Sequence, residues 1–204
     1  MSRAMLAASM KRARVFGFAL AASVPLAVLF TPRSARAFER EWHVGGGVGL
    51  TAYPHYYTAG PALGVNAAYG ISDVFDLKLE LLGSLNTYTP PFSKADAMAG
   101  RKPLPSEHAE PWSAVAGLSY KLDVLQWIPY GALLVGFQHI GGRLPVGEPF
   151  RRDDALAAIV LGLDYAATRD FGLGASIRSD ILLTSPERGA AFTPMLRAEY
   201  HWGF

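Results

Sequence analysis

Cysteine is absent from the 204 residues of the chain, and charged residues are sparse. Without cysteine the protein can form neither disulfide bonds nor thiolate metal sites. Asp, Glu, Lys and Arg make up 18% of the residues, whereas half of all residues are hydrophobic. The length suits one substantial domain and is too short for two large ones. After residue 37 no hydrophobic stretch is long enough for a spanning helix, so membrane insertion there would require strands.

The first 37 residues have the three parts of a secretory signal. Residues 11–14 contain three basic side chains, residues 15–30 form an apolar run, and Ala35–Ala37 is a small-residue cleavage pattern. A membrane anchor is the alternative, but the apolar run contains a proline and falls short of the roughly 20 residues that cross a bilayer. The sequence therefore predicts a signal peptide over 1–37, cleavage after about Ala37, and a mature domain over 38–204.

Cleavage would also change the charge of the protein. The predicted signal peptide carries six basic residues and no acidic ones, which leaves 13 basic and 17 acidic residues and a net charge of −4. The net charge of +2 for the whole sequence is thus a property of the signal peptide. We expect no nucleic-acid partner, because the mature domain has no basic excess.

The last twelve residues alternate in character. In a β-strand every second residue shares a face. One face would be polar or small, and the other would carry Leu196, Ala198, Tyr200, Trp202 and Phe204. This ending resembles the C-terminal assembly signal of bacterial outer-membrane β-barrels. The resemblance implies that the barrel assembly machinery is a partner and that Tyr200, Trp202 and Phe204 form the signal.

Seven earlier segments alternate with the same period of two, which indicates strands and not helices. The predicted strands cover 41–53, 63–71, 75–86, 113–123, 127–140, 157–165 and 171–181. Long connections are expected over 54–61, 89–111, 141–152 and 184–192, and short turns near Ser72, Val124 and Thr168. All long connections would lie at one end, as is typical of transmembrane barrels. The sequence predicts an all-β, eight-stranded antiparallel up-and-down transmembrane β-barrel in the outer membrane, surrounded by its lipids.

The predicted lipid-facing side of each strand is its apolar side. For the fifth strand, which alternates less cleanly, we expect Ile128, Tyr130, Ala132 and Leu134 to point outward. Aromatic rings then gather beside the short turns, at Trp42, Tyr69, Phe75, Tyr120, Tyr130, Tyr165, Phe171, Tyr200, Trp202 and Phe204. Such a belt is typical of a lipid headgroup boundary. A soluble β-sandwich, the alternative, would spread its large rings through the core.

Closure of the barrel follows, because an open sheet edge in hydrocarbon leaves backbone groups unpaired. Eight strands give a lumen that side chains can fill. Opposite charges on the inward faces are expected to pair there. The predicted network consists of Asp76, Lys78, Glu80, Asp164, Arg178, Asp180, Arg197 and Glu199. A path for protons or ions is the alternative reading of these charges.

The pattern and the ending together resemble the small eight-stranded group that includes the transmembrane domain of outer membrane protein A. The resemblance covers nearly all of residues 38–204. Outer membrane protein A carries a periplasmic peptidoglycan-binding domain after its barrel. This sequence has no counterpart to that domain, so tethering to the cell wall is not expected.

No catalytic residue, metal ligand or cofactor is predicted. His139, near the outer end of the fifth strand, is the best-placed histidine for hydrolysis, but Gly141 occupies the position where the lipid A deacylase barrels have the serine of a His-x-Ser motif. His43 and His201 face inward on adjacent strands, and a metal site there would need further ligands. We therefore expect a structural or surface-interaction protein whose loops 89–111 and 141–152 contact any external ligand. A narrow conduit for small solutes or hydrophobic molecules is the alternative, and a lipid-modifying enzyme is less expected.

Overall fold

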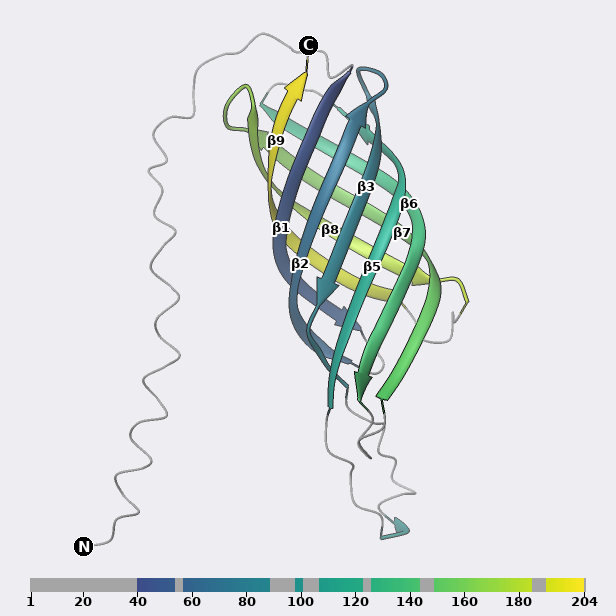
Figure 1. The fold of residues 1–204 in the computed structure, drawn as a ribbon. Coiled ribbons are helices and arrows are strands. Elements are labelled where there is room, and N and C mark those ends of the chain that lie inside the picture. The colour runs from purple at the N-terminus through teal and green to yellow at the C-terminus, as the bar shows by residue number, and fades with distance from the viewer. Residues whose placement is uncertain are drawn as a thin grey trace, which may run out of the picture. The chain divides into compact units, whose positions relative to one another are not determined.

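The computed structural model describes residues 40–53, 57–88, 98–100, 107–122, 126–143, 149–184 and 190–203, and it folds the strands among them into one closed antiparallel β-barrel (Figure 1). The strands are β1 (Glu41–Tyr53), β2 (Tyr57–Gly70), β3 (Phe75–Ser84), β4 (Asn86–Tyr88), β5 (Glu107–Lys121), β6 (Trp127–Arg143), β7 (Pro149–Ala166), β8 (Phe171–Leu182) and β9 (Ala190–Gly203). The predicted signal peptide and Phe204 lie outside the described residues. In the described part of the chain, no helix has the length and hydrophobicity to span a membrane.

The barrel has eight strand positions, because β3 and β4 are two parts of one strand. Both parts pair with β2 on one side and with β5 on the other. The interruption lies at Leu85, whose N–H donates to the Pro61 carbonyl at 3.0 Å. A Cβ on Gly60 would come within 1.8 Å of the Leu85 carbonyl oxygen, so this crossing needs glycine. Because β1 pairs with both β2 and β9, the sheet closes, and the predicted fold class is confirmed.

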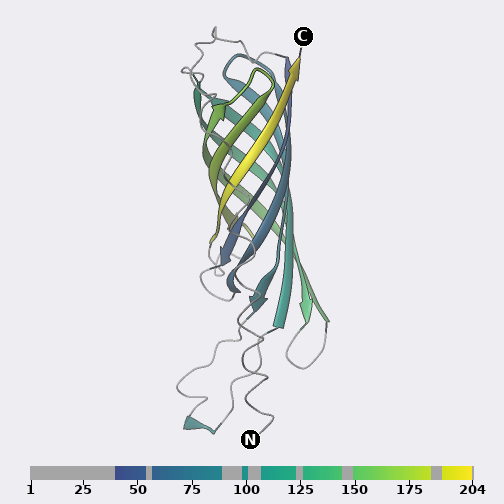
Figure 2. The ribbon, with the colours of Figure 1, turned by 90° about the vertical axis from the view of Figure 1, so that its left-hand side faces the viewer.

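Two ends of the barrel differ in their connections. Tight turns join β2 to β3 and β7 to β8, where the Ile71 N–H donates to the Phe75 carbonyl and the Thr168 N–H to the Phe171 carbonyl, each at 2.9 Å. We call this the short-turn end, and β1 begins and β9 ends there. At the opposite, long-loop end, β5, β6 and β7 extend beyond their neighbours (Figures 1 and 2).

The strands at the long-loop end are longer than predicted. The β6–β7 ladder continues to the pair Arg143 and Pro149, and β5 begins at Glu107. The expected loops 54–61, 89–111, 141–152 and 184–192 are therefore partly strand. Their polar and proline residues conceal the pairing from a search for apolar alternation, although the backbone continues the ladder.

The strands point their apolar side chains outward and most of their charged ones inward. Leu63, Leu133 and Leu196 are each more than 60% exposed, whereas Asp76 and Arg178 are 1% exposed. This arrangement is the inverse of a soluble sandwich, in which the apolar faces meet in a core. A lipid environment is the medium that such an outer face requires.

The predicted phase of the fifth strand, now β6, is wrong. Its residues Ile128, Tyr130, Ala132 and Leu134 point into the lumen and are buried, and Trp127, Leu133, Val135 and Phe137 point outward. Both faces of β6 are apolar, so a period of two fits either orientation. The register decides, because Leu133 pairs with Leu118 on β5 and with Ile159 on β7, which both face outward.

Aromatic rings gather on the outer face at the short-turn end. Trp42 contacts Tyr69 with ring centroids 4.9 Å apart, and Phe75 contacts Tyr120 at 5.2 Å. Trp127, not Tyr130, continues this belt, since its ring lies 4.9 Å from that of Tyr165. At the end of β9 the outward rings of Tyr200 and Trp202 stack at 5.8 Å.

Candidate functional site

The lumen has one apolar wall and one charged wall. The apolar wall is built by β5, β6 and β7 from Val115, Tyr130, Ala132, Leu134, Leu156, Ala158 and Val160. Most of the buried charged side chains come from β1, β3, β8 and β9. Charged groups in such an interior are costly unless each finds a partner. Ion pairs between side chains of different strands therefore define the site.

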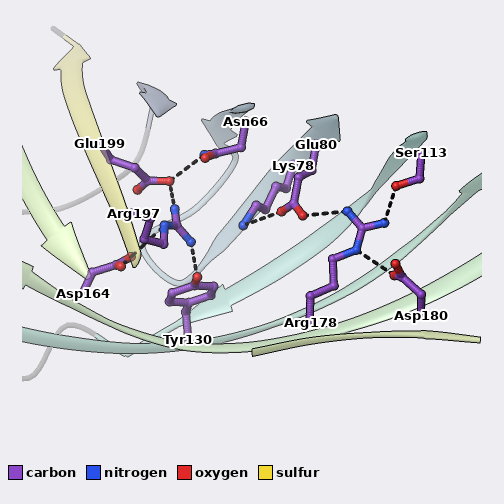
Figure 3. Close-up of polar contacts among 10 residues, drawn as sticks. All are labelled: Asn66, Lys78, Glu80, Ser113, Tyr130, Asp164, Arg178, Asp180, Arg197 and Glu199. Atoms are coloured by element: carbon purple, nitrogen blue, oxygen red, sulfur yellow. Dashed lines mark hydrogen bonds and ion pairs between the residues drawn. The ribbon is translucent and has the colours of Figure 1, made fainter. Parts of the chain in front are cut away.

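Arg178 on β8 holds the central cluster (Figure 3). Its Nε donates to Asp180 Oδ1 at 2.7 Å, its Nη1 to Glu80 Oε1 at 2.8 Å, and its Nη2 to Ser113 Oγ at 2.9 Å. Lys78 Nζ lies 3.4 Å from the second oxygen of Glu80. Each of the three guanidinium nitrogens thus donates a hydrogen bond to an oxygen, and these oxygens come from β8, β3 and β5.

The pair of Arg178 and Glu80 spans the lumen. In the order of the closed barrel, β8 and β3 are separated by three strand positions in either direction. They are therefore opposite each other across the lumen. Because these side chains come from opposite walls and meet at 2.8 Å, they together cross the whole width of the barrel.

Arg197 on β9 holds a second cluster, nearer the short-turn end (Figure 3). It donates to Glu199 and to the Tyr130 hydroxyl, and its Nε lies 3.7 Å from Asp164 Oδ1. Asn66 Nδ2 donates to the same oxygen of Glu199 at 2.6 Å. Arg197 thus contacts carboxylates from β7 and β9 and a phenol from the apolar wall.

Tyr130 is a site residue that sequence reasoning missed, because it was expected to face lipid. The Arg197 guanidinium lies over its ring at 4.8 Å and Lys78 Nζ lies 5.1 Å from the ring centroid, both favourable cation–π distances. Its cross-strand partner is Gly162, where a Cβ would come within 2.3 Å of the ring. A glycine on the neighbouring strand opposite this large aromatic residue was the sequence signal that could have indicated its inward orientation.

Smaller contacts join side chains near both ends of the lumen. At the long-loop end Gln138 on β6 donates to the Tyr53 hydroxyl on β1, again from opposite walls, and Asn86 Nδ2 donates to the Thr51 carbonyl at 2.9 Å. At the short-turn end Lys121 Nζ lies 2.6 Å from Asp76 Oδ2. Between these levels a cavity of about 20 Å³ is lined by Gly47, Gly64, Asn66, Glu80, Met195 and Arg197, among others. Such a volume suits about one water molecule.

All eight residues named from the sequence as a lumen network face inward, and each belongs to an ion pair of the structure. The pairs join Lys78 to Glu80, Glu80 to Arg178, Arg178 to Asp180, Arg197 to Asp164 and Glu199, and Lys121 to Asp76. Lys121 is the cation that completes this set. Of the residues named for an assembly signal, Tyr200 and Trp202 lie on the outer face of β9.

His139 lies on the outer face near the long-loop end. Its Nδ1 lies 2.7 Å from Asp153 Oδ1, its cross-strand partner, and its ring centroid is 5.6 Å from that of Trp112. A Cβ at Gly141 would lie 3.7 Å from His139 Nε2, so the place for a nucleophile beside this base holds a glycine. The arrangement has the base and carboxylate of a hydrolytic triad but lacks its nucleophile at that position.

The fold is similar to several solved structures. The outer membrane protein OprG of Pseudomonas aeruginosa matches with a TM-score of 0.61 and 11% identity, over 84% of this chain and 100% of that one. Ail, the attachment invasion locus protein of Yersinia pestis, in complex with the heparin analogue sucrose octasulfate, matches with a TM-score of 0.56 and 15% identity, over 80% of this chain and 99% of Ail. Neisserial surface protein A matches with a TM-score of 0.52 and 15% identity, over 80% of this chain and 96% of that one.

Comparisons of the sequence alone give no match. No protein-family model matches the chain, and neither does any curated protein. The likeness therefore shows the fold, which is the small eight-stranded barrel that those bacterial outer-membrane proteins form.

Proposed function

We propose that the chain is an outer-membrane β-barrel whose lumen is plugged by side chains and whose role is structural or in surface contacts. The observation that carries the proposal is the bar of Arg178 and Glu80 from opposite walls, because its two side chains occupy the width of the lumen. Gln138 and Tyr53 make a second crossing at the long-loop end. A diffusing solute would have to pass both crossings, of which only the central one is an ion pair.

The outer face supports location in a membrane. Large apolar side chains cover it along every strand position, at exposures that would be costly in water over so large a patch. The aromatic belt at the short-turn end suits a headgroup boundary. With that end in the periplasm, the long-loop end would face the cell exterior, as the connection lengths of outer-membrane barrels suggest.

The surface role rests on the long-loop end. There β5, β6 and β7 carry paired backbone beyond their neighbours, to the pairs Ala109 with Gly142 and Arg143 with Pro149. Rigid strands that project from a membrane suit the presentation of connecting segments to a partner. Ail, with the same small barrel, is named for attachment and invasion, and we propose a comparable contact role for segments 89–111 and 141–152.

Planar-bilayer recording separates a plugged barrel from a narrow conduit. We expect no stable openings from the wild type, and small openings from the double variant Arg178→Ala/Glu80→Ala, which removes the central bar. Asp153→Ala, which removes a charge outside the lumen, is the matched control and should behave as the wild type. Stable single-channel openings of the wild type would refute the plug.

A lipid assay tests the enzymatic alternative. Incubation with labelled lipopolysaccharide and phospholipid should show neither acyl loss nor acyl transfer, because Gly141 supplies no nucleophile to His139. Turnover that disappears in His139→Ala would replace the structural role with a catalytic one.

A further inference from the structure

One three-residue pattern occurs on both strands that close the barrel. It is Glu41-Trp42-His43 on β1 and Glu199-Tyr200-His201 on β9. In each copy the middle aromatic points outward, into the belt, and the glutamate and histidine point into the lumen and are buried. Near the short-turn end the two copies bring three potential metal ligands together, namely His43, His201 and Glu199.

The register brings the copies together. His43 and His201 are direct cross-strand partners, and their ring centroids are 4.4 Å apart. Each glutamate lies opposite a glycine, since Glu41 pairs with Gly203 and Glu199 with Gly45. A Cβ on Gly45 would lie 2.5 Å from Glu199 Cγ, and one on Gly203 would lie 2.9 Å from Glu41 Cγ. The glycines thus provide the space that the two glutamate side chains occupy.

The donor atoms lie close to the spacing that one ion requires. Ligand atoms of His43, Glu199 and His201 lie within 4.8 Å of one another. In a tetrahedral zinc site with bonds of about 2.0–2.1 Å, neighbouring ligand atoms are roughly 3.4 Å apart. His201 Nε2 and Glu199 Oε2 already lie 3.5 Å apart. Side-chain rotations that move the donor atom of the third residue by about an ångström would bring it to that spacing.

The surroundings of Glu199 prepare it as a ligand. Arg197 and Asn66 both contact its Oε1, which leaves Oε2 directed at His201. Among the described residues His201 Nε2, although buried, has no hydrogen-bond partner. A ligating carboxylate whose other oxygen is held by neighbouring donors is the usual outer-shell arrangement of a metal site.

We propose that His43, His201 and Glu199 bind a divalent transition-metal ion. Two imidazoles with carboxylates suit ions such as Zn²⁺, whereas Ca²⁺ and Mg²⁺ select all-oxygen sites. The Glu199 carboxylate also offsets part of the double charge of the ion. A metal at this level would join the first strand to the last and fasten the seam at which the barrel closes.

Lys121 lies beside the His43 side of this site. Its Nζ lies 3.5 Å from His43 Nδ1 and 2.6 Å from Asp76 Oδ2. A metal ion bound at His43 Nε2 leaves the ring proton on Nδ1. Nδ1 can then no longer accept a hydrogen bond from Lys121. The ammonium keeps its ion pair with Asp76, so metal binding does not leave it without a counter-charge.

Zinc binding to the full-length protein tests the proposal. Protein purified in detergent without a polyhistidine tag and stripped with chelator is titrated with ZnCl₂. We expect one zinc ion per chain with a dissociation constant in the micromolar range or below, and no competition from excess Mg²⁺. His201→Gln and His43→Gln should each weaken binding at least tenfold. His139→Gln, which removes a histidine from the outer face, should bind as the wild type.

Zinc-edge X-ray absorption of the wild type gives a readout that needs no variant to fold. We expect two imidazole ligands and carboxylate oxygen. The proposal is overturned if the wild type does not bind zinc saturably, if fewer than two imidazoles coordinate the ion, or if His139→Gln weakens binding as much as His201→Gln does.

Discussion

Replacement of Arg178 by methionine tests whether the lumen depends on paired charge. The side chain is 1% exposed and its guanidinium meets Asp180, Glu80 and Ser113 at 2.7 to 2.9 Å. Methionine fills a similar volume but donates no hydrogen bond. After the change Glu80 keeps Lys78 at 3.4 Å, whereas Asp180 loses the cation that the structure gives it.

The expected cost follows from that asymmetry. Breaking a buried pair by removal of one partner costs about 3–5 kcal/mol, because the other charge remains buried without compensation. Since Glu80 keeps a partner, we expect the lower end, about 3 kcal/mol. The double variant Arg178→Met/Asp180→Asn restores charge balance and should cost about half as much. The double-mutant cycle should therefore give a coupling of at least about 1 kcal/mol.

Urea unfolding of the refolded protein in phospholipid vesicles measures these free energies. All four tryptophans lie on the outer face, at positions 42, 112, 127 and 202, so their fluorescence reports the loss of contact with lipid. If the losses of the single variants Arg178→Met and Asp180→Asn add up to the loss of the double variant, the charges of Arg178 and Asp180 are not coupled, and the account of the lumen as an ion-pair network is refuted.

Three further predictions concern the outer face and the chain end. Leu79→Arg should lower the free energy of unfolding by about 2–4 kcal/mol, because Leu79 faces lipid between Ala67 and Ala116; urea titration against Leu79→Ala checks this, and an unchanged midpoint would contradict it. Cysteine at 133 should react with a lipid-soluble maleimide in vesicles and cysteine at 134 should not, since Leu133 faces outward and Leu134 is buried; equal labelling would reject the orientation of β6. Deletion of Phe204 should reduce the yield of protein in the outer membrane more than the stability of the assembled barrel; full yield would rule out the proposed assembly signal.

The fold could be predicted because a barrel in lipid repeats one simple rule. Each strand must present apolar side chains to lipid, so a period of two recurs along β3, for example from Phe75 to Leu81. The strand number and the connection pattern follow from counting such segments. Strand ends at the long-loop side could not be predicted this way, since Pro111 and Pro149 pair within ladders beyond the apolar stretch.

The phase of β6 could not be read from its own residues. Its inward Ile128 and Leu134 are as apolar as its outward Leu133 and Val135. The information lies in the neighbours, because a single step in register would turn every side chain to the other face. Two glycines on neighbouring strands also indicate the phase of β6. Gly162 leaves room for Tyr130, and Gly117 lies opposite Leu134, where a Cβ would come within 2.1 Å of the Leu133 carbonyl.

The partners within the lumen lie beyond the reach of sequence reasoning for a geometric reason. Arg178 and Glu80 are 98 residues apart in the chain and meet because their strands are opposite in an eight-position ring. Period and composition show that both face inward, but the level of each along the barrel depends on strand tilt and register. The charges must nevertheless pair somewhere, since an uncompensated charge would oppose folding. The existence of a network is thus determined by local pattern, whereas its connections are determined by closure of the sheet. Any change that shifts the register of β8 should therefore disrupt the lumen pairs of Arg178 even where every inward side chain is kept.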